Sequence, residues 1–362
     1  MRIAVFHSFL DNIGGAEMVA LTLSRELKAD LYTTNIDRLK VKKMGFEDVA
    51  VKSIGRVPIH SPFRQQLTLA KFRSIDLAND YDFFIIAGDW AVSAAVNNRP
   101  NLWYVHSMMK EIWDLAPITK KNNVPWLLKP AFDFWAGFNR GLVAKYVKSV
   151  DKVVVNSAVT KKRVSYFIGR DATIIYPPVA VEKYHHSPSE NFWLSVNRLI
   201  DHKKVEIQLE AFSKLPNERL IIVGSYERAN HFTRYVKRLK KLKPKNVEFL
   251  SWVDQAELID LYAKCKGFIT TSDNEDFGLT AVEAMASGKP VIAPNQGGYC
   301  ESVVGGKCGI LIDNISSDSL AAAIKQVNGK ISSYQSECLN QAKKFDVGSF
   351  SLQIKREIGG GS

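Results

Sequence analysis

Two glutamates, Glu275 and Glu283, stand on either side of Gly278 in the segment E-D-F-G-L-T-A-V-E. The segment follows an apolar run, and we expect a helix to open at about Gly278. There the backbone N–H groups of Leu279 and Thr280 could approach an anion, which the helix dipole also favours. Glu283 lies roughly two turns beyond Glu275, so both carboxylates return to nearly the same face. Two such acceptors beside an anion site suit the hydroxyls of a sugar and a ribose. The plainer alternative makes Glu275 a helix cap and Glu283 a surface residue.

The motif continues into the run G-K-P-V-I-A from Gly288, and then into Gly297, Gly298 and Glu301. Together these residues resemble the nucleotide-sugar signature of glycosyltransferase family 4, which has the two-domain GT-B fold. The resemblance covers almost the whole chain and is most specific over residues 192–313. It implies a retaining transferase that uses a nucleotide-diphosphate sugar. It also implies roles for single residues: Glu283 on the ribose, Glu275 on the donor sugar as a catalytic residue, Phe277, Gly278, Leu279 and Thr280 on the donor, and Gly297 and Gly298 on the acceptor side.

Two or three cations stand at the end of one expected strand. The segment F-W-L-S-V-N-R-L-I-D-H-K-K resembles the family's Gly-Arg plus Lys-Gly element, with Asn197 and Lys204 in place of its glycines. The resemblance makes Arg198 and Lys203 catalytic, because two cations on one diphosphate would stabilise the departing nucleotide. Lys204 is assigned to donor binding, and whether Lys203 or Lys204 makes the contact stays open. An exposed lysine pair on a helix is the alternative.

A pair of glycines, Gly14 and Gly15, follows the first expected strand and begins a helix that contains Glu17. The spacing is not that of a dinucleotide-binding G-x-G-x-x-G, which argues against an NAD enzyme. Alone, a Gly-Gly pair is typical of a turn. At this position it is similar to the family's glycine loop, which implies that Gly14 and Gly15 contact the donor and that Glu17 lies on the acceptor side.

A histidine, His106, ends another strand in the segment W-Y-V-H-S-M-M-K-E-I-W-D. The segment is similar to the family's Tyr-x-His-x-Pro-x-Arg-x-x-Trp-Asp stretch, with Met108 for the proline and Lys110 for the arginine. The resemblance implies that His106 contacts the transferred sugar and that Lys110 lies on the acceptor side. A lone histidine at a strand end is otherwise most often structural.

Metal and nucleophile motifs are scarce. No His/Cys cluster has zinc spacing, and no Gly-x-Ser-x-Gly elbow occurs. Asp80 and Asp82 form an Asp-x-Asp pattern at the start of an N-terminal strand, far from the donor elements, and we take it as chance. We therefore expect no metal and no cofactor, with a nucleotide-diphosphate sugar as co-substrate and GDP-mannose favoured. Arg198 and Lys203 would supply the charge that a metal otherwise would. The family implies same-face attack, in which the donor phosphate takes the acceptor proton.

These residues must be positioned by strands and helices that alternate along the chain. Val- and Ile-rich runs at 3–6, 83–87, 103–105, 153–155 and 173–176 predict buried strands, and 16–28 predicts a helix. The pattern stops near residue 180 and restarts at 192–196, 220–223, 247–250, 267–270, 290–293 and 309–312. Alternation of this kind predicts an α/β chain of two doubly wound, Rossmann-like domains facing a cleft.

The expected domains are an acceptor-binding domain at 1–178 and a nucleotide-sugar domain at 179–345. A C-terminal helix at 346–358 is expected to cross back to the first domain. The residues 359–362, G-G-G-S, resemble an added linker and are left out of the domain assignment.

Charge is the anomaly in an otherwise ordinary globular composition, with 46% hydrophobic and 24% charged residues and a net charge of +12 over 362 residues. Residues 51–150 carry 13 basic and 7 acidic side chains, interleaved with Trp and Phe. Such a mixture suits the headgroup layer of an anionic membrane, although the aromatic residues could equally form a domain core. A second basic run, 234–245, predicts the solvated face of a helix with Val236, Leu239 and Leu242 inward.

The sequence as a whole predicts a glycosyltransferase that moves a hexose, mannose by preference, to a lipid-linked or membrane-presented glycan. We expect it in the cytoplasm, peripheral on the inner face of the membrane, since no apolar run is long enough to span a bilayer and no signal peptide is visible. The four cysteines are expected to be reduced thiols. Two alternatives stay open: a nucleotide-sugar 2-epimerase of the same fold, and a basic nucleic-acid-binding protein. We rank the nucleic-acid-binding protein last and expect no nucleic acid among the partners.

Overall fold

The computed structural model describes residues 1–59, 63–122, 124–225, 230–251 and 253–359. The chain divides into two compact units: unit 1 comprises Met1–Tyr176 with Phe350–Ser362, and unit 2 comprises Pro177–Ser349. Gly359 ends the last helix, and the other residues of the expected linker, 360–362, lie outside the described part. Within the described part, no helix is both long and apolar enough to span a membrane.

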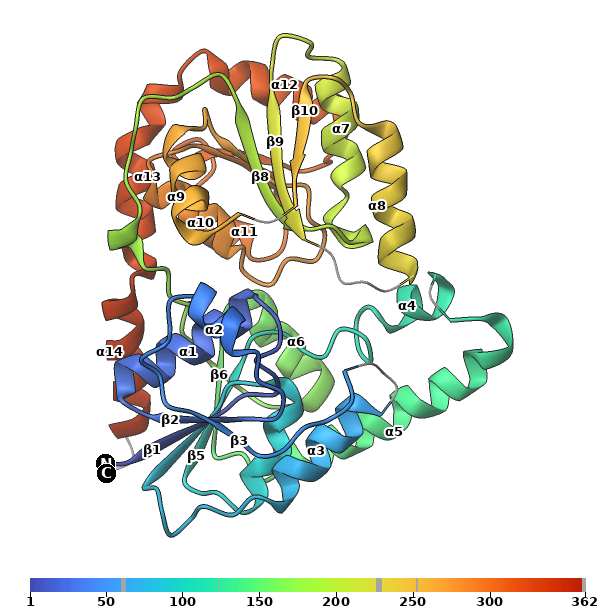
Figure 1. Ribbon diagram of the computed structural model, residues 1–362, viewed down its shortest axis with the longest axis vertical. Helices are drawn as coiled ribbons and strands as arrows, with labels where there is room; N and C mark the ends of the chain where they lie inside the picture. The colour runs from blue at the N-terminus through green and yellow to red at the C-terminus, as the bar shows by residue number, and fades with distance from the viewer. Residues whose placement is uncertain (60–62, 123, 226–229, 252, 360–362) are drawn as a thin grey trace. The chain divides into compact units, whose positions relative to one another are not determined.

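Unit 1 is built on a parallel sheet (Figure 1). Its strand order is β3-β2-β1-β4-β5-β6-β7. Its strands are β1 (Ile3–Phe6), β2 (Asp30–Thr33), β3 (Val51–Ser53), β4 (Phe83–Ile86), β5 (Asn101–Val105), β6 (Lys152–Val155) and β7 (Thr173–Ile174). The strands predicted from buried apolar runs are confirmed. β2 and β3 were missed because both mix polar with apolar residues; β3 is an edge strand, whereas β2 lies between β3 and β1.

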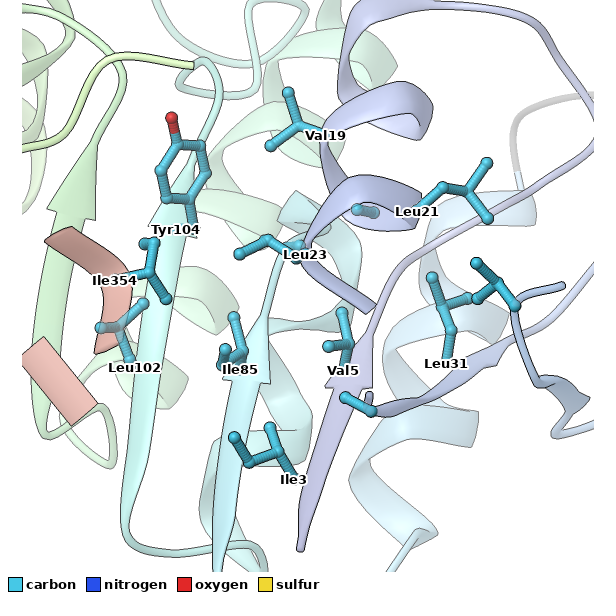
Figure 2. Packing of buried hydrophobic residues seen from close by; sticks show 14 of the residues in the cluster. Ile3, Val5, Val19, Leu21, Leu23, Leu31, Ile85, Leu102, Tyr104 and Ile354 are labelled. Carbon is cyan, nitrogen blue, oxygen red and sulfur yellow. The ribbon is translucent and has the colours of Figure 1, made fainter. Parts of the chain in front are cut away.

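The helical segments of unit 1 cover both faces of this sheet. They are α1 (Gly15–Leu27), α2 (Arg38–Lys43), α3 (Arg64–Ser74), η1 (Asp89–Val96), α4 (Ala116–Asn122), η2 (Trp126–Leu128), α5 (Lys129–Val147), α6 (Ala158–Ile168) and α14 (Val347–Gly359). Successive residues of a strand point to opposite faces. Ile3 and Val5 therefore join the core beneath α1 and α14 (Figure 2), whereas Ala4 and Phe6 join the core beneath α3, η1 and α5.

The C-terminal helix α14 belongs to the core of unit 1 although it follows unit 2 in the chain. Phe350, Ile354 and Ile358 recur at four-residue spacing and are all buried in the α1 face of the sheet. The ring of Phe350 meets Tyr104 of β5 edge-on at 5.8 Å between centroids, and Lys152 donates to the Glu357 carbonyl at 2.5 Å. The helix thus returns to unit 1 through apolar packing, as the sequence predicted.

Unit 2 repeats the plan with the strand order β10-β9-β8-β11-β12-β13. Its strands are β8 (Trp193–Arg198), β9 (Leu220–Ser225), β10 (Val247–Leu250), β11 (Phe268–Ile269), β12 (Val291–Pro294) and β13 (Gly309–Ile312). Its helical segments are η3 (Val181–Lys183), η4 (Asp201–Lys203), α7 (Val205–Ser213), α8 (Asn230–Leu242), α9 (Gln255–Lys264), α10 (Leu279–Ala286), α11 (Tyr299–Ser302), α12 (Ser317–Asn328), η5 (Ile331–Tyr334), α13 (Gln335–Ala342) and η6 (Lys343–Phe345). Every strand predicted in this half is present.

Helix α8 carries the basic run and departs from the prediction at its end. Val236 and Leu239 are buried as expected, but Leu242 is 53% exposed. The helix ends at Leu242, two residues before Pro244, so this side chain projects past the last turn instead of reaching the core. Its basic side chains are exposed, and Arg238 pairs with Glu206 of α7 at 3.3 Å.

The start of α10 is closely packed. Gly278 caps the helix in the left-handed region with φ of 90°, and a Cβ placed there would lie 2.5 Å from the ring of Tyr299. Gly306 has a similar φ of 80° but nothing within 4 Å of such a Cβ. The two positions therefore share the backbone requirement and differ only in packing.

We expect Gly278→Ala to lower the free energy of unfolding by about 2–5 kcal/mol, because a left-handed backbone and overpacking both oppose the methyl group. Gly306→Ala should cost only the backbone part, about 1–2 kcal/mol. Urea unfolding followed by circular dichroism measures both values. Equal losses in the two variants would show that the Tyr299 contact does not constrain position 278.

Candidate functional site

The predicted site residues gather at the carboxyl edges of the two sheets. In each unit the strand order reverses beside the first strand, between β8 and β11 in unit 2 and between β1 and β4 in unit 1. Parallel sheets bind ligands at the carboxyl ends of the strands, at this switch point. Lys203 and Glu275 follow β8 and β11, and His7 and Ala87 follow β1 and β4.

An ion pair joins the two strands at the switch point of unit 2. Lys203 Nζ lies 2.6 Å from Glu275 Oε2, and the two side chains are only 15% and 20% exposed. The same carboxylate oxygen accepts a hydrogen bond from Ser272 Oγ at 3.0 Å and one from the Tyr299 hydroxyl at 3.4 Å. Glu275 is therefore held by three donors and is not a simple helix cap.

The neighbouring cations differ from Lys203 in their partners. Lys204 forms an ion pair with Asp273, a residue that the sequence analysis did not single out. Its backbone is left-handed, with φ of 46°, at the position where the resembled family has glycine. Arg198 ends β8 and is exposed, and no hydrogen bond or ion pair joins its guanidinium to another of the described residues. Arg198 is thus the cation most open to a ligand.

The N-terminus of α10 offers backbone amides beside this cluster. Leu279 and Thr280 are its first two residues, and their N–H groups have no acceptor in the described part of the chain. Gly297 and Gly298 let the next loop approach closely: a Cβ on Gly298 would lie 2.2 Å from the Phe277 Cα. The Gly298 N–H donates to the Glu275 carbonyl at 2.9 Å. The two glycines therefore brace the loop that carries Glu275, and Phe277 is buried beneath it.

Glu283 is enclosed by two tyrosines from other parts of unit 2. The Tyr262 hydroxyl donates to Glu283 Oε2 at 2.8 Å, and Tyr184 of the connecting segment also lies against this carboxylate. Burial raises the pKa of Glu283, while these two hydroxyls oppose the rise by hydrogen bonding to the carboxylate. Glu283 is thus not the surface residue of the plainer alternative. The connecting segment is itself fixed by buried Lys289, which donates to the Ser187 carbonyl at 2.9 Å.

In unit 1, two histidines lie at the carboxyl edge of the sheet. His7 Nδ1 is 3.0 Å from the Ala87 carbonyl, and the rings of His7 and His106 meet edge-on with centroids 6.5 Å apart. The Nε2 atom of His106 is buried without a hydrogen-bond partner among the described residues. Burial lowers the pKa of His106 to about 3, and the neighbouring His7 adds to this. His106 is therefore a neutral ring, and its Nε2 atom is a buried polar group left unpaired within the described residues.

The glycine loop of unit 1 is covered by a side chain of the helix that follows it. Gly14 caps α1, and the Glu17 carboxylate folds back over it, 2.6 Å from the position of a Gly14 Cβ. The carboxylate thus lies at the N-terminus of α1, which attracts anions, and any phosphate that approached Gly14 or Gly15 would meet it. Lys110 follows β5 by five residues and is half-buried, in the segment after His106.

Sequence reasoning missed a charged cluster next to this loop. Arg64 of α3 pairs with Asp11 through a single nitrogen, Nη2, which lies 2.8 and 2.7 Å from the two carboxylate oxygens. Lys40 donates to the Asp11 carbonyl at 2.6 Å, and the Arg64 guanidinium lies 3.7 Å above the Phe9 ring. No local spacing links these residues, since they come from separate elements. In the described residues, no three His, Cys, Asp or Glu side chains gather as metal ligands would.

Two family profiles match the chain, one in each half. The profile described as Glycosyltransferase Family 4 matches residues 13–183. The profile described as Glycosyl transferases group 1 matches residues 180–344. Between them they account for the chain from residue 13 to residue 344, including all the predicted site residues.

Several curated relatives are similar over most of their length. The alpha-1,3/1,6-mannosyltransferase ALG2 of Dictyostelium discoideum is 27% identical over 399 residues, covering 92% of this chain and 91% of the relative. The ALG2 of Candida glabrata is 25% identical over 372 residues, covering 84% of this chain and 78% of the relative.

Solved structures match the fold from end to end. Anabaena HepE in complex with UDP-glucose has a TM-score of 0.80 at 22% identity, covering 99% of this chain and 100% of that one. Sucrose-phosphate synthase from Thermosynechococcus elongatus has a TM-score of 0.79 at 17% identity, covering both chains fully. At these identities the likeness bears on the fold alone, and it confirms the predicted GT-B class of two Rossmann-like domains. Because the profiles for glycosyltransferase family 4 and for glycosyl transferases group 1 together account for residues 13–344, the chain belongs to glycosyltransferase family 4.

Proposed function

We propose that this glycosyltransferase moves a mannosyl residue from GDP-mannose to a lipid-linked glycan, with retention of the anomeric configuration. The observation that carries the proposal is the Lys203–Glu275 pair at the switch point of unit 2, beside the exposed Arg198. The similarity to ALG2 mannosyltransferases supports mannose as the sugar. The complexes of HepE with UDP and UDP-glucose support a nucleotide-sugar donor for the fold without fixing the base. Because a lipid-linked acceptor lies at a bilayer, we place the enzyme peripherally at the inner face of the membrane.

In this proposal the residues of unit 2 hold the donor. Arg198 and Lys203 neutralise the diphosphate, whose negative charge grows as the glycosidic bond breaks. The amides of Leu279 and Thr280 bind the same group at the N-terminus of α10. Glu283 accepts hydrogen bonds from the ribose hydroxyls, and Glu275 accepts one from the transferred sugar. Lys203 is preferred over Lys204 because it is the more buried of the two and lies against Glu275.

The transfer needs no group beyond donor, acceptor and these side chains. The acceptor hydroxyl oxygen forms a bond to the anomeric carbon on the face from which the diphosphate leaves. The bond between that carbon and the phosphate oxygen breaks, and its electron pair goes to the departing nucleoside diphosphate. The proton of the acceptor hydroxyl passes to a donor phosphate oxygen. Neutral His106 orients a sugar hydroxyl through its unpaired Nε2 atom.

A donor screen tests the proposal. Purified enzyme is offered GDP-mannose, UDP-glucose and ADP-glucose with octyl α-mannoside as the acceptor, and the products are identified by mass spectrometry and by the one-bond C1–H1 coupling of the new glycosidic bond. Transfer from GDP-mannose with an α-linked product is expected. Release of free epimerised sugar without an acceptor would favour the 2-epimerase instead, and transfer from UDP-glucose alone would contradict the choice of donor.

Single substitutions separate the two lysines. Lys203→Met should lower kcat by at least ~10²-fold, since it removes a cation from the charge that develops on the diphosphate. Lys204→Met should lower kcat less than ~10-fold, because the Lys204–Asp273 pair is more open to solvent, with the side chains 38% and 35% exposed. Steady-state kinetics with saturating donor measures both, with the exposed Glu210→Gln of α7 as a control. A larger loss in Lys204→Met would transfer the diphosphate contact to that residue.

Glu275→Gln should also lose at least ~10²-fold in kcat while its unfolding midpoint shifts by only a few degrees, because the amide keeps the packing and part of the hydrogen bonding. Turnover close to wild type with every donor would remove Glu275 from the proposed mechanism.

The state of His106 makes a prediction about pH. The unfolded chain binds a proton at His106 near the ordinary pKa of 6.5, whereas the folded chain does so only near 3. Stability is therefore highest above about pH 6.5 and falls as the pH drops through this window, by up to about 1.4 kcal/mol per pH unit for one such group. His106→Asn should flatten the dependence of the urea midpoint on pH between 4 and 6.5. The exposed His185→Asn should leave the slope unchanged, and an unchanged slope in His106→Asn would contradict neutral burial.

A further inference from the structure

Unit 1 carries an arm made of α4, η2 and α5, and Figure 1 shows α5 extending outward from the rest of this unit. Large apolar side chains of the arm face solvent. Their exposed fractions are 56% for Ile118, 75% for Trp126, 69% for Leu127, 56% for Leu128, 77% for Phe134 and 53% for Phe138. Monomeric proteins rarely leave large apolar side chains together on the surface unless they serve an interaction.

Helix α5 has two clearly different faces. Ala136, Asn139 and Val143 are buried against the sheet side of unit 1. On the outer side, the rings of Phe134 and Phe138 lie one turn apart and stack at 6.4 Å between centroids. Packing of the buried face against unit 1 stabilises the helix. The two outer phenylalanines do not contribute to the core. The aromatic residues of this stretch thus divide between partly buried positions, such as Phe132 and Trp135, and exposed ones, such as Phe134 and Phe138.

Helix α3 extends the apolar surface beside α5. Gln66 of α3 donates to Asn139 of α5 at 2.9 Å, which fixes the two helices side by side. Phe63 and Leu67, on either side of Gln66, are 67% and 44% exposed. Helix α3 and the residue before it thus also carry exposed large apolar side chains.

The charged residues of the arm are mostly basic. Residues 116–147 contain five basic side chains and one acidic one. The acidic residue, Asp133, already pairs with Lys120 at 2.5 Å. Lys121 is exposed next to it, and Lys129 opens α5 beside the apolar residues of η2. Lysine ammonium groups can sit in a headgroup layer while their stems and nearby rings enter the acyl boundary.

We propose that this arm is the surface by which the enzyme docks on an anionic lipid bilayer. The inference deepens the proposed function, on which it rests for the presence of a lipid-linked acceptor. Exposed Trp and Phe among lysines match the amphipathic headgroup region, and each lysine near an anionic surface adds to the attraction. A second copy of the chain fits less well, because a two-fold contact through this face would bring the same lysines together. Neutral lipid fits less well too, since it leaves the positive charge without a counterpart.

Vesicle flotation tests the docking surface without substrate or turnover. Wild-type enzyme is mixed with phosphatidylcholine vesicles or with vesicles containing 30% phosphatidylglycerol, and the bound fraction is measured at low and high salt. The wild type should float with the anionic vesicles, and ten-fold or more of the binding should be lost in the variant carrying Trp126→Ser, Phe134→Ser and Phe138→Ser. Lys121→Glu with Lys129→Glu should weaken binding mainly at low salt. The matched control changes two exposed apolar residues elsewhere in unit 1, Leu39→Ser and Tyr166→Ser, which are 72% and 84% exposed.

The outcomes separate this inference from the proposed function. Triple-variant enzyme that keeps its circular dichroism spectrum and its transfer to octyl α-mannoside, but no longer floats, supports the docking surface. Vesicle binding without any sugar transfer would leave the docking surface standing and overturn the proposed function. The docking proposal is overturned if the wild type does not float, if the triple variant and the control float equally, or if light scattering shows a dimer that the triple variant dissociates.

Discussion

The Lys203–Glu275 pair constrains much of unit 2. Opposite charges that are four-fifths or more enclosed are tolerated only with good geometry and further hydrogen bonds. Ser272 and Tyr299 supply those bonds, and the ring of Tyr299 leaves room for no side chain at Gly278. The hydrogen bonds of the Glu275 carboxylate therefore help to set the direction in which α10 begins. That direction in turn sets where the first amides of α10 point.

The carboxyl edge of the sheet in unit 1 carries different side chains from that of unit 2. There the switch point holds uncharged rings, His7 and His106, and burial lowers the pKa of both. A neutral histidine can orient a sugar hydroxyl without adding charge, whereas the cations of unit 2 suit a diphosphate. The chemistry of the two edges thus fits a division between sugar orientation and donor binding, which is how the proposed function uses them.

Much of this could be predicted from the sequence because the motifs are local. Glu275, Gly278 and Leu279 lie within five positions of one another in the sequence. A strand before them and a helix after them are enough to bring them together in space. Asp273 was within reach of the same reasoning, as an acidic residue between the strand end and Glu275. Tyr299 and Tyr262 were not, since their contacts with Glu275 and Glu283 depend on how separate helices pack. The aromatic stretch of residues 126–138 shows the limit of composition, which cannot tell Ala136, turned inward, from Phe134, turned outward.

Hydrogen exchange measured by mass spectrometry tests the central claim, that the switch point of unit 2 holds the nucleotide-diphosphate sugar. Enzyme is labelled alone, with GDP-mannose and with GDP. The account predicts slower exchange in peptides that cover residues 198–205 and 275–284, because the amides of Leu279 and Thr280 gain an acceptor and the Lys203 loop becomes fixed. Protection confined to the Gly14–Glu17 loop, with no change in those two peptides at saturating GDP-mannose, would contradict it.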